Sequence, residues 1–209
     1  MKLILAGATG LVGRHVLAFA LADPRVEAVI APTRRTLPGH PKLFAPIVDF
    51  DRLPEDADWW RADAVACALG TTIKVAGSQD VFRRVDFDYP LAFARLAHRH
   101  GAQTYVLNSA KGADAASRIF YSRTKGELEQ ALRQVGFDSL TFVRPGLIGG
   151  ERDTPRSGEH IASVVLGALH PLLPRGWRIN PADRIARCLL KAAIAANPGV
   201  HAVESAELA

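Results

Sequence analysis

Short apolar runs alternate along this chain with longer segments whose apolar residues recur at helical spacing. Such runs are typical of parallel strands buried on both faces, and the longer segments are typical of helices that cover them. Strands are predicted over residues 2–6, 26–32, 43–48, 64–69, 105–107 and 140–143, with an edge strand over 201–203. Helices are predicted over residues 11–21, 78–100, 122–135, 159–170 and 182–196. This alternation predicts an α/β fold, a Rossmann-type doubly wound parallel sheet.

Proline and glycine refine these boundaries. Pro46 favours an edge position for the third strand, because proline cannot donate to a sheet ladder. Pro90 predicts a helix start or kink, and Gly136 predicts the end of the helix that begins near residue 122. We expect residues 1–209 to form one domain, with residues 149–209 supplying most of a small C-terminal region on the substrate side.

Three glycines spaced three apart follow the first strand and open the first helix. Gly7 allows a sharp turn, Gly10 leaves room for a pyrophosphate, and Gly13 allows the helix to pack closely on the sheet. The helix N-terminus then offers unpaired N–H groups to the anion. The predicted cofactor-binding turn comprises Gly7, Ala8, Thr9, Gly10, Leu11, Val12 and Gly13.

Two arginines follow the second predicted strand, at the position that in dinucleotide-binding folds lies next to the adenosine ribose. An acidic residue at this point binds the 2′-hydroxyl of NAD, whereas arginine accepts the 2′-phosphate of NADP. Here Arg34 and Arg35 occupy the position, so NADP(H) is favoured over NAD(H), the alternative being that both are solvated loop charges. Asp49 ends the third strand and, on its residue type alone, is an ordinary strand-end cap.

A tyrosine and a lysine four residues apart supply the candidate chemistry. At the start of a helix this spacing places Tyr121 and Lys125 on one face, and Ser109 ends the fifth strand. Carbonyl reduction needs a proton donor as hydride arrives, and a nearby ammonium favours the phenolate of the reverse reaction. We therefore predict Tyr121 as the acid and base, Lys125 as its activating cation, and Ser109 as the donor that orients the substrate. The alternative is a structural tyrosine.

The glycine spacing resembles that of extended and atypical short-chain dehydrogenases/reductases. Longer blocks resemble one group of them, the human Tat-interacting, oxidoreductase-like proteins and their bacterial relatives. These blocks include 69–72 (LGTT), 74–78 (KVAGS), 82–89 (FRRVDFDY), 109–114 (SAKGAD), 125–127 (KGE), 144–146 (RPG) and 152–159 (RDTPRSGE). The resemblance implies NADP(H) binding on a Rossmann fold and catalytic roles for Ser109, Tyr121 and Lys125. It also implies cofactor contacts by Asp49, Leu69, Gly70, Thr71, Tyr121, Lys125 and Pro145.

Composition narrows the function classes. The 209 residues carry a net charge of +5, and 48% of them are hydrophobic, as in ordinary globular proteins. Cys67 and Cys188 lie far apart, and the histidines show no metal-binding spacing, so we expect no metal. No apolar run suits a membrane span or signal peptide, which favours a cytoplasmic location. Binding of nucleic acid would rest on charge alone, at Arg175, Trp177, Arg178, Arg184 and Arg187, and is not expected.

These features favour an NADP(H)-dependent oxidoreductase acting on a small carbonyl or alcohol, as a monomer or homodimer. An NADP(H)-binding regulatory or protein-interaction module with little turnover is the alternative, because the C-terminal region is short for an elaborate substrate pocket.

Overall fold

The computed structural model describes residues 1–149 and 178–209. The predicted helix over residues 159–170 and the motif-like stretch 152–159 therefore lie outside the described residues.

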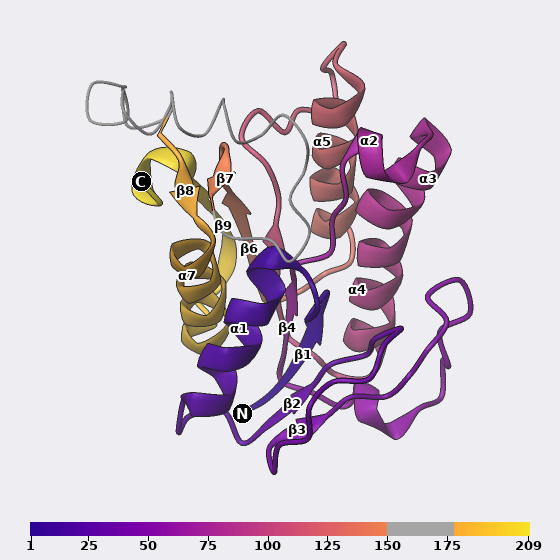
Figure 1. Ribbon diagram of the computed structural model, residues 1–209, viewed down its shortest axis with the longest axis vertical. Helices are drawn as coiled ribbons and strands as arrows, with labels where there is room; N and C mark the ends of the chain where they lie inside the picture. Colours follow the sequence, from indigo (N-terminus) through magenta and orange to yellow (C-terminus); the bar gives the residue numbers. More distant parts are fainter. Residues whose placement is uncertain (150–177) are drawn as a thin grey trace.

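Seven parallel strands form the central sheet, in the order β3-β2-β1-β4-β5-β6-β9 (Figure 1). From β1 the chain adds β2 and β3 on one side of the sheet and then crosses to add β4, β5 and β6 on the other side. This reversal next to β1 confirms the doubly wound Rossmann-type fold. The strands are β1 (Lys2–Ala6), β2 (Ala28–Ile30), β3 (Leu43–Phe44), β4 (Ala64–Cys67), β5 (Thr104–Asn108), β6 (Ser139–Arg144) and β9 (Gly199–Glu204). A second, small parallel sheet that the sequence did not predict pairs β7 (Ile148–Gly149) with β8 (Asn180–Pro181).

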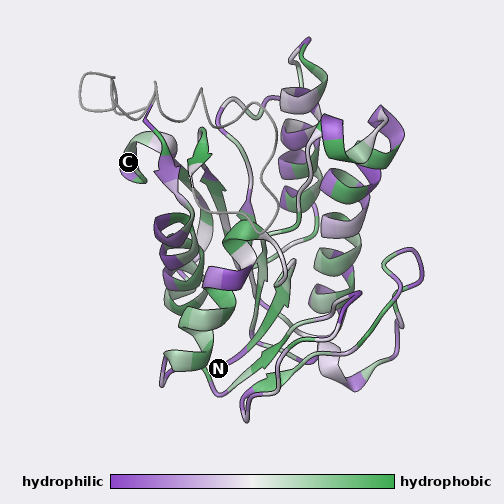
Figure 2. Cartoon of the chain, in the orientation of Figure 1, coloured by the Kyte–Doolittle hydropathy of each residue, from purple (hydrophilic) through white to green (hydrophobic). Residues whose placement is uncertain are grey.

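Helices cover both faces of the sheet. One face carries α1 (Leu11–Ala22) and α7 (Ala182–Ala195), and the opposite face carries α4 (Tyr89–Arg99) and α5 (Phe120–Arg133). A separate apolar core fills the space on each side, and the apolar residues of the strands lie between these layers (Figure 2). Each central strand is therefore buried on both faces, as its continuous apolar run predicts.

The long predicted helix over residues 78–100 is interrupted. It consists of α3 (Gln79–Arg83), a π-helical turn at Arg84–Asp88 and α4, with Pro90 in the first turn of α4. The short helix α2 (Ile73–Ala76) precedes it, capped by the Thr72 side chain. Pro90 lies in the first turn of α4, at the junction with the π-helical turn, which agrees with the predicted helix start or kink because proline has no N–H to donate to the preceding turn.

Two strands are shorter than the apolar pattern predicts. Strand β2 covers only residues 28–30, and β3 covers 43–44 with one further bridge between Thr33 and Ile47. Pro46 lies beside that bridge, and β3 is an edge strand, as Pro46 predicted. The missing N–H of proline explains why regular pairing does not continue through it.

The C-terminal elements belong to the doubly wound domain itself. Helix α7 packs against α1, and β9 extends the sheet beside β6. Helix α7 and β9 are thus part of the packed sheet domain, and the expectation that residues 149–209 supply most of the substrate side stays a prediction. The physical reason for the packing of α7 is its apolar stripe, which includes Ile185 and Leu189 and packs into the core on the α1 face of the sheet.

Candidate active site

The glycine turn between β1 and α1 leaves no room for side chains. Gly7 has φ of +89°, and a Cβ there would lie 2.8 Å from the carbonyl carbon of Ala68, at the end of β4. A Cβ on Gly13 would lie 2.0 Å from the carbonyl oxygen of Gly7, and one on Gly10 would lie 3.3 Å from the same oxygen. Gly10 is also the N-cap of α1 and has no side chain to satisfy the N–H groups of the first turn. Those N–H groups can bind an anion.

Both predicted arginines at the end of β2 are exposed. The guanidinium of Arg34 lies 5.8 Å from the centre of the Phe50 ring, and the backbone of Arg35 donates to the buried Thr33 hydroxyl at 3.2 Å. Within the described ranges, neither guanidinium forms an ion pair with a carboxylate. Asp49 is exposed nearby, and one of its carboxylate oxygens accepts the Asp51 backbone N–H at 3.0 Å. Asp49 thus acts as a turn cap through this oxygen, and its predicted contact with the cofactor stays a prediction.

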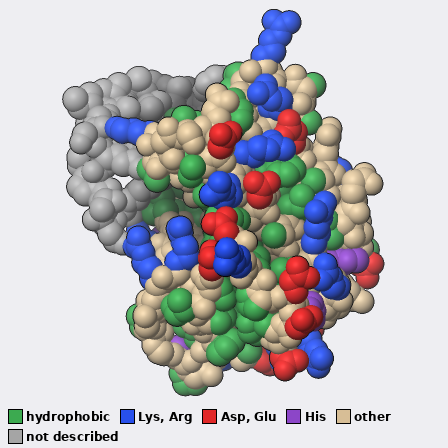
Figure 3. Space-filling model, turned by 90° about the vertical axis from the view of Figure 1, so that its right-hand side faces the viewer, with side chains coloured by type: hydrophobic (Ala, Val, Ile, Leu, Met, Phe, Trp, Pro, Cys, Tyr) green, Lys and Arg blue, Asp and Glu red, His purple; other side chains and the backbone are tan. Residues whose placement is uncertain are grey.

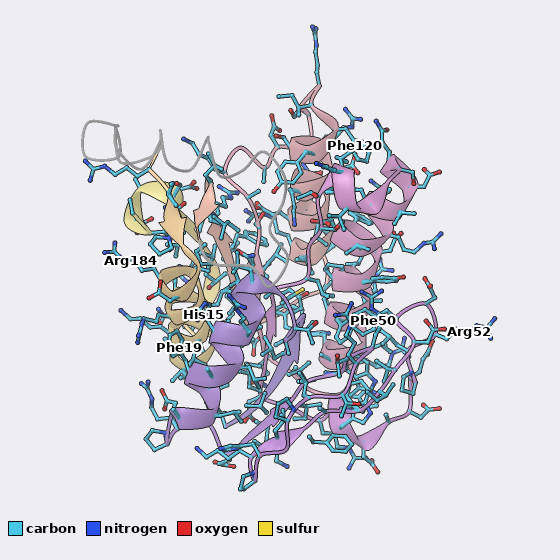
Figure 4. All side chains as sticks on the ribbon, in the orientation of Figure 1. His15, Phe19, Phe50, Arg52, Phe120 and Arg184 are labelled. Atoms are coloured by element: carbon cyan, nitrogen blue, oxygen red, sulfur yellow. The ribbon has the colours of Figure 1, made fainter. Side chains whose placement is uncertain are left out.

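Tyr121 and Lys125 share one face of α5 but differ in exposure. Tyr121 lies in the first turn of the helix and is 38% exposed, with its ring 5.7 Å from that of Phe82. Phe120, which opens the helix near α2 and α3, also packs on Phe82 at 5.6 Å (Figure 4). Lys125 is only 4% exposed. The helix therefore presents an accessible phenol one turn before a buried ammonium.

Lys125 pairs with a carboxylate on the π-helical turn. Its Nζ lies 2.7 Å from Oδ1 of Asp86, which is 1% exposed, and Oδ2 of Asp86 accepts the Thr71 backbone N–H at 2.7 Å. Burial opposes the charge of Lys125, but the charges of Asp86 and Tyr121 outweigh it, so the pKa of Lys125 is raised. A Cβ on Gly70 would lie 3.4 Å from Asp86 Oδ1 and 3.9 Å from Lys125 Nζ. Lys125 thus lies directly under the loop predicted to bind the cofactor.

Ser109 is hydrogen-bonded through its hydroxyl to a buried carboxylate. Its hydroxyl donates to Glu129 Oε1 at 2.6 Å, and Arg144 binds the same carboxylate through Nε at 3.0 Å and Nη2 at 2.5 Å. A further Arg144 nitrogen binds Glu204 of β9 at 2.8 Å. The hydrogen bonds that Arg144 donates to Glu129 raise the pKa of Arg144 above its usual value. Because its single proton is used in this way, Ser109 in this rotamer has none to offer a substrate oxygen.

The turn after β6 is held by side chains that the sequence did not single out. Pro145 is buried, and its carbonyl accepts the Lys111 N–H at 2.8 Å. The Gly146 N–H donates to the fully buried Asn180 at 2.6 Å, and Asn180 is bound in turn by Ser205. These contacts fix the predicted cofactor contact at Pro145 beside the end of β5.

Sequence reasoning missed Asp86 and Glu129 as partners of the predicted residues. Asp86 lies four residues after the buried Phe82, so it is an acid on an apolar helix face. An acid in that position needs a buried partner, and this signal could have found it. Glu129, by contrast, follows Lys125 by four residues, a spacing that is typical of an ion pair on an exposed helix surface. The sequence therefore gives no sign that Glu129 is buried.

Two of the arginines weighed for nucleic acid make local contacts. Arg187 on α7 lies 4.1 Å over the ring of Phe19 on α1, and Arg184 donates to the carbonyl of Ala209. Arg175 and Trp177 lie outside the described residues. Basic and acidic side chains are interspersed on the face shown in Figure 3.

Comparison with known proteins defines the family. No protein-family model matches the chain. The mitochondrial protein fmp52 of Emericella nidulans is 34% identical over 208 residues, which covers 93% of this chain and 88% of fmp52. Protein HTATIP2 of Rattus norvegicus is 32% identical over 203 residues, covering 95% and 83%. The chain belongs to the HTATIP2 and fmp52 family of atypical short-chain dehydrogenases. The resemblance seen in the sequence is confirmed.

A solved structure outside this family shares the fold. MoeE5 in complex with UDP-glucose and NAD superposes with a TM-score of 0.74 at 15% identity, covering 97% of this chain and 75% of MoeE5. At this identity the likeness concerns the fold alone. It supports a Rossmann-like fold for this member of the HTATIP2 and fmp52 family.

The predicted cytoplasmic location is wrong as it stands. The fmp52 relatives of Emericella nidulans, Aspergillus niger and Candida albicans are all named mitochondrial, which points away from a purely cytoplasmic location. The prediction rested on the lack of a recognisable signal, whereas location is set by address segments that receptors read and not by the fold. In the described ranges, no helix combines the length and apolar character needed to cross a bilayer.

Proposed function

We propose that this protein is an NADP(H)-dependent oxidoreductase that interconverts a small carbonyl compound and its alcohol. The observation that carries the proposal is the pairing on α5 of an accessible phenol, Tyr121, with a buried ammonium, Lys125, beside the Gly70 loop. Membership of the atypical short-chain dehydrogenases supports the same reaction class. A phenol and an ammonium in one site suit proton transfer to a carbonyl oxygen.

The residues present fit a dinucleotide. Cβ atoms at Gly7 and Gly13 would collide with the backbone of Ala68 and Gly7, so glycine at these positions allows the tight turn from β1 into α1. Gly10, the N-cap, adds no side chain at the N-terminus of α1, where a pyrophosphate would bind. Arg34 and Arg35 are exposed and would bind a 2′-phosphate, which is the basis for preferring NADP(H). When bound, the cofactor supplies or accepts the hydride.

The protein's own groups would then handle the proton. Tyr121 donates its phenolic proton to the substrate oxygen as the alcohol forms and takes it back in the reverse direction. Lys125 stabilises the phenolate by its charge and binds the ribose of the cofactor through its remaining N–H groups. For Ser109 to orient the substrate, its hydroxyl must leave Glu129, at a cost of about 1.5–3 kcal/mol for a hydrogen bond to a charged group.

A matched pair of tyrosine variants tests this proposal. Tyr121→Phe removes the proposed proton donor, and Tyr89→Phe removes a hydroxyl that donates to Asp51 at 2.8 Å on another part of the chain. We expect Tyr121→Phe to bind NADPH within about twofold of wild type but to lose roughly 100-fold or more of its turnover on small aldehydes and ketones. Tyr89→Phe should retain turnover. Equal turnover in Tyr121→Phe and wild type would overturn the proposal.

One observation favours the alternative of a regulatory module that binds NADP(H) with little turnover. The proton of Ser109 is held by Glu129, and the charge of Lys125 is balanced by Asp86, so two of the three predicted catalytic groups have partners within the protein. A broad substrate screen with no turnover, together with tight NADPH binding and a partner whose binding depends on NADPH, would favour this function. A partner that binds equally well without NADPH would count against it.

A further inference from the structure

We propose that Asp86 is a positioning residue for the reaction, holding Lys125 charged and in place beneath the cofactor-binding loop. The proposal rests on the proposed function, because it concerns the same site. Asp86 acts through Lys125 and the loop at residues 69–71, and it is assigned no contact with the substrate.

The first step of the argument is burial. Asp86 and Lys125 are 1% and 4% exposed, and their charged atoms lie 2.7 Å apart. An ammonium that loses its water must gain an equivalent partner or release its proton. The distance and the burial together identify Asp86 as that partner.

The second step concerns the other groups that face Lys125. These are Tyr121 from its own helix and Cys67 from β4. Burial raises the pKa of the Cys67 thiol, so Cys67 is neutral near pH 7. Tyr121 is a phenol that must exchange its proton during the reaction. Among the residues that the structure describes, Asp86 is therefore the one lasting negative charge beside Lys125.

The third step concerns position. The same carboxylate binds Lys125 through Oδ1 and the Thr71 N–H through Oδ2. Gly70 lies over the pair, since a Cβ there would come within 3.4 Å of Oδ1. The π-helical turn at Arg84–Asp88 widens the helix at this point, and such turns are frequent at functional sites. Asp86 thus fixes the ammonium and the loop relative to each other.

Asp86→Asn tests the proposal, and Asp88→Asn is the matched control. Asp88 lies on the same π-helical turn but is exposed. Without the carboxylate, the buried Lys125 loses its proton at a lower pH, and NADPH binding weakens as the pH rises. From about pH 7 to about pH 10, we expect the NADPH dissociation constant of Asp86→Asn to rise about tenfold, and that of wild type and Asp88→Asn less than twofold.

Asp86→Glu, which keeps the charge, should restore the flat profile. A flat profile in Asp86→Asn would overturn the proposal, because a merely structural role for Asp86 would weaken binding equally at every pH.

A second measurement needs no variant of Asp86. In wild-type protein with ¹³C-labelled lysine ε-carbons, the Lys125 signal is assigned by its loss in Lys125→Arg. We expect this signal to titrate above the pH at which the exposed lysines titrate. Titration together with them, or below them, would overturn the proposal. Neither readout requires turnover, so a failure of Asp86 to control Lys125 is distinguishable from a lack of reductase activity in the Tyr121 experiment.

Discussion

Gly126 provides a test in which two physical effects predict opposite signs. It follows Lys125 in the middle of α5, where alanine is favoured over glycine by about 1 kcal/mol through helix propensity. A Cβ at this position would, however, lie 2.2 Å from the backbone nitrogen of Ala115 and 2.2 Å from the carbonyl carbon of Asp114. Overpacking of this kind costs typically 1–3 kcal/mol, and the upper end applies because both neighbours are backbone atoms, so roughly 3 kcal/mol is expected here.

The net expectation for Gly126→Ala is therefore a loss of about 2 kcal/mol in the free energy of unfolding. In a chain of this length, that loss lowers the melting temperature by roughly 4–8 °C. Circular dichroism during heating and in urea measures both quantities. Gly39→Ala is the control, since no atom lies within 4 Å of a Cβ at Gly39. A Gly126→Ala variant as stable as wild type, or more stable, would refute the reasoning.

Three further predictions follow from the charged groups of the site. Glu129→Gln should lower the free energy of unfolding by about 3 kcal/mol, because it leaves the charge of Arg144 without its buried partner; unchanged urea unfolding would contradict this. Arg34→Ala should weaken NADPH binding roughly tenfold and leave NADH binding unchanged, since only NADPH carries the 2′-phosphate; calorimetry showing equal losses would exclude a selective role. The raised pKa of Lys125 means that its contribution to stability is complete below its usual pKa of 10.5 and is lost as pH rises above that value. Urea midpoints should therefore fall more steeply above about pH 10.5 in wild type than in Lys125→Met, and parallel curves would contradict the assignment.

Most of the fold could be predicted because its signals are local. The continuous apolar runs identify the central strands, and the glycine turn after β1 identifies the dinucleotide-binding topology. Pro46 and Pro90 correctly place an edge strand and a helix start. The edge strand β9 was also expected, although it is longer than residues 201–203 because it pairs with β6 along six residues.

The parts that could not be predicted depend on contacts between distant residues. The π-helical turn at Arg84–Asp88 follows no local pattern, and its purpose becomes visible only when Lys125, from another helix, lies against Asp86. The position of Ser109 at the end of the fifth strand predicted a donor for the substrate, but that position contains no information about Glu129, which accepts the hydroxyl proton. The role of Ser109 stays a prediction, as do the other catalytic and cofactor contacts.

The packing of α7 against α1 has a consequence for synthesis of the protein. Helix α1 and its glycine turn leave the ribosome well before α7, the helix from residues 182–195 that covers the same face of the sheet. The sheet likewise stays open beside β6 until residues 199–204 have emerged. Both β9 and Glu204, which binds Arg144, arrive late, so a nascent chain carries the glycine turn long before the contacts of Arg144 are complete. The Glu129–Arg144–Glu204 contacts beside Ser109 thus wait for residues 199–204, and a nascent chain that lacks α7 and β9 exposes an apolar sheet face to chaperones.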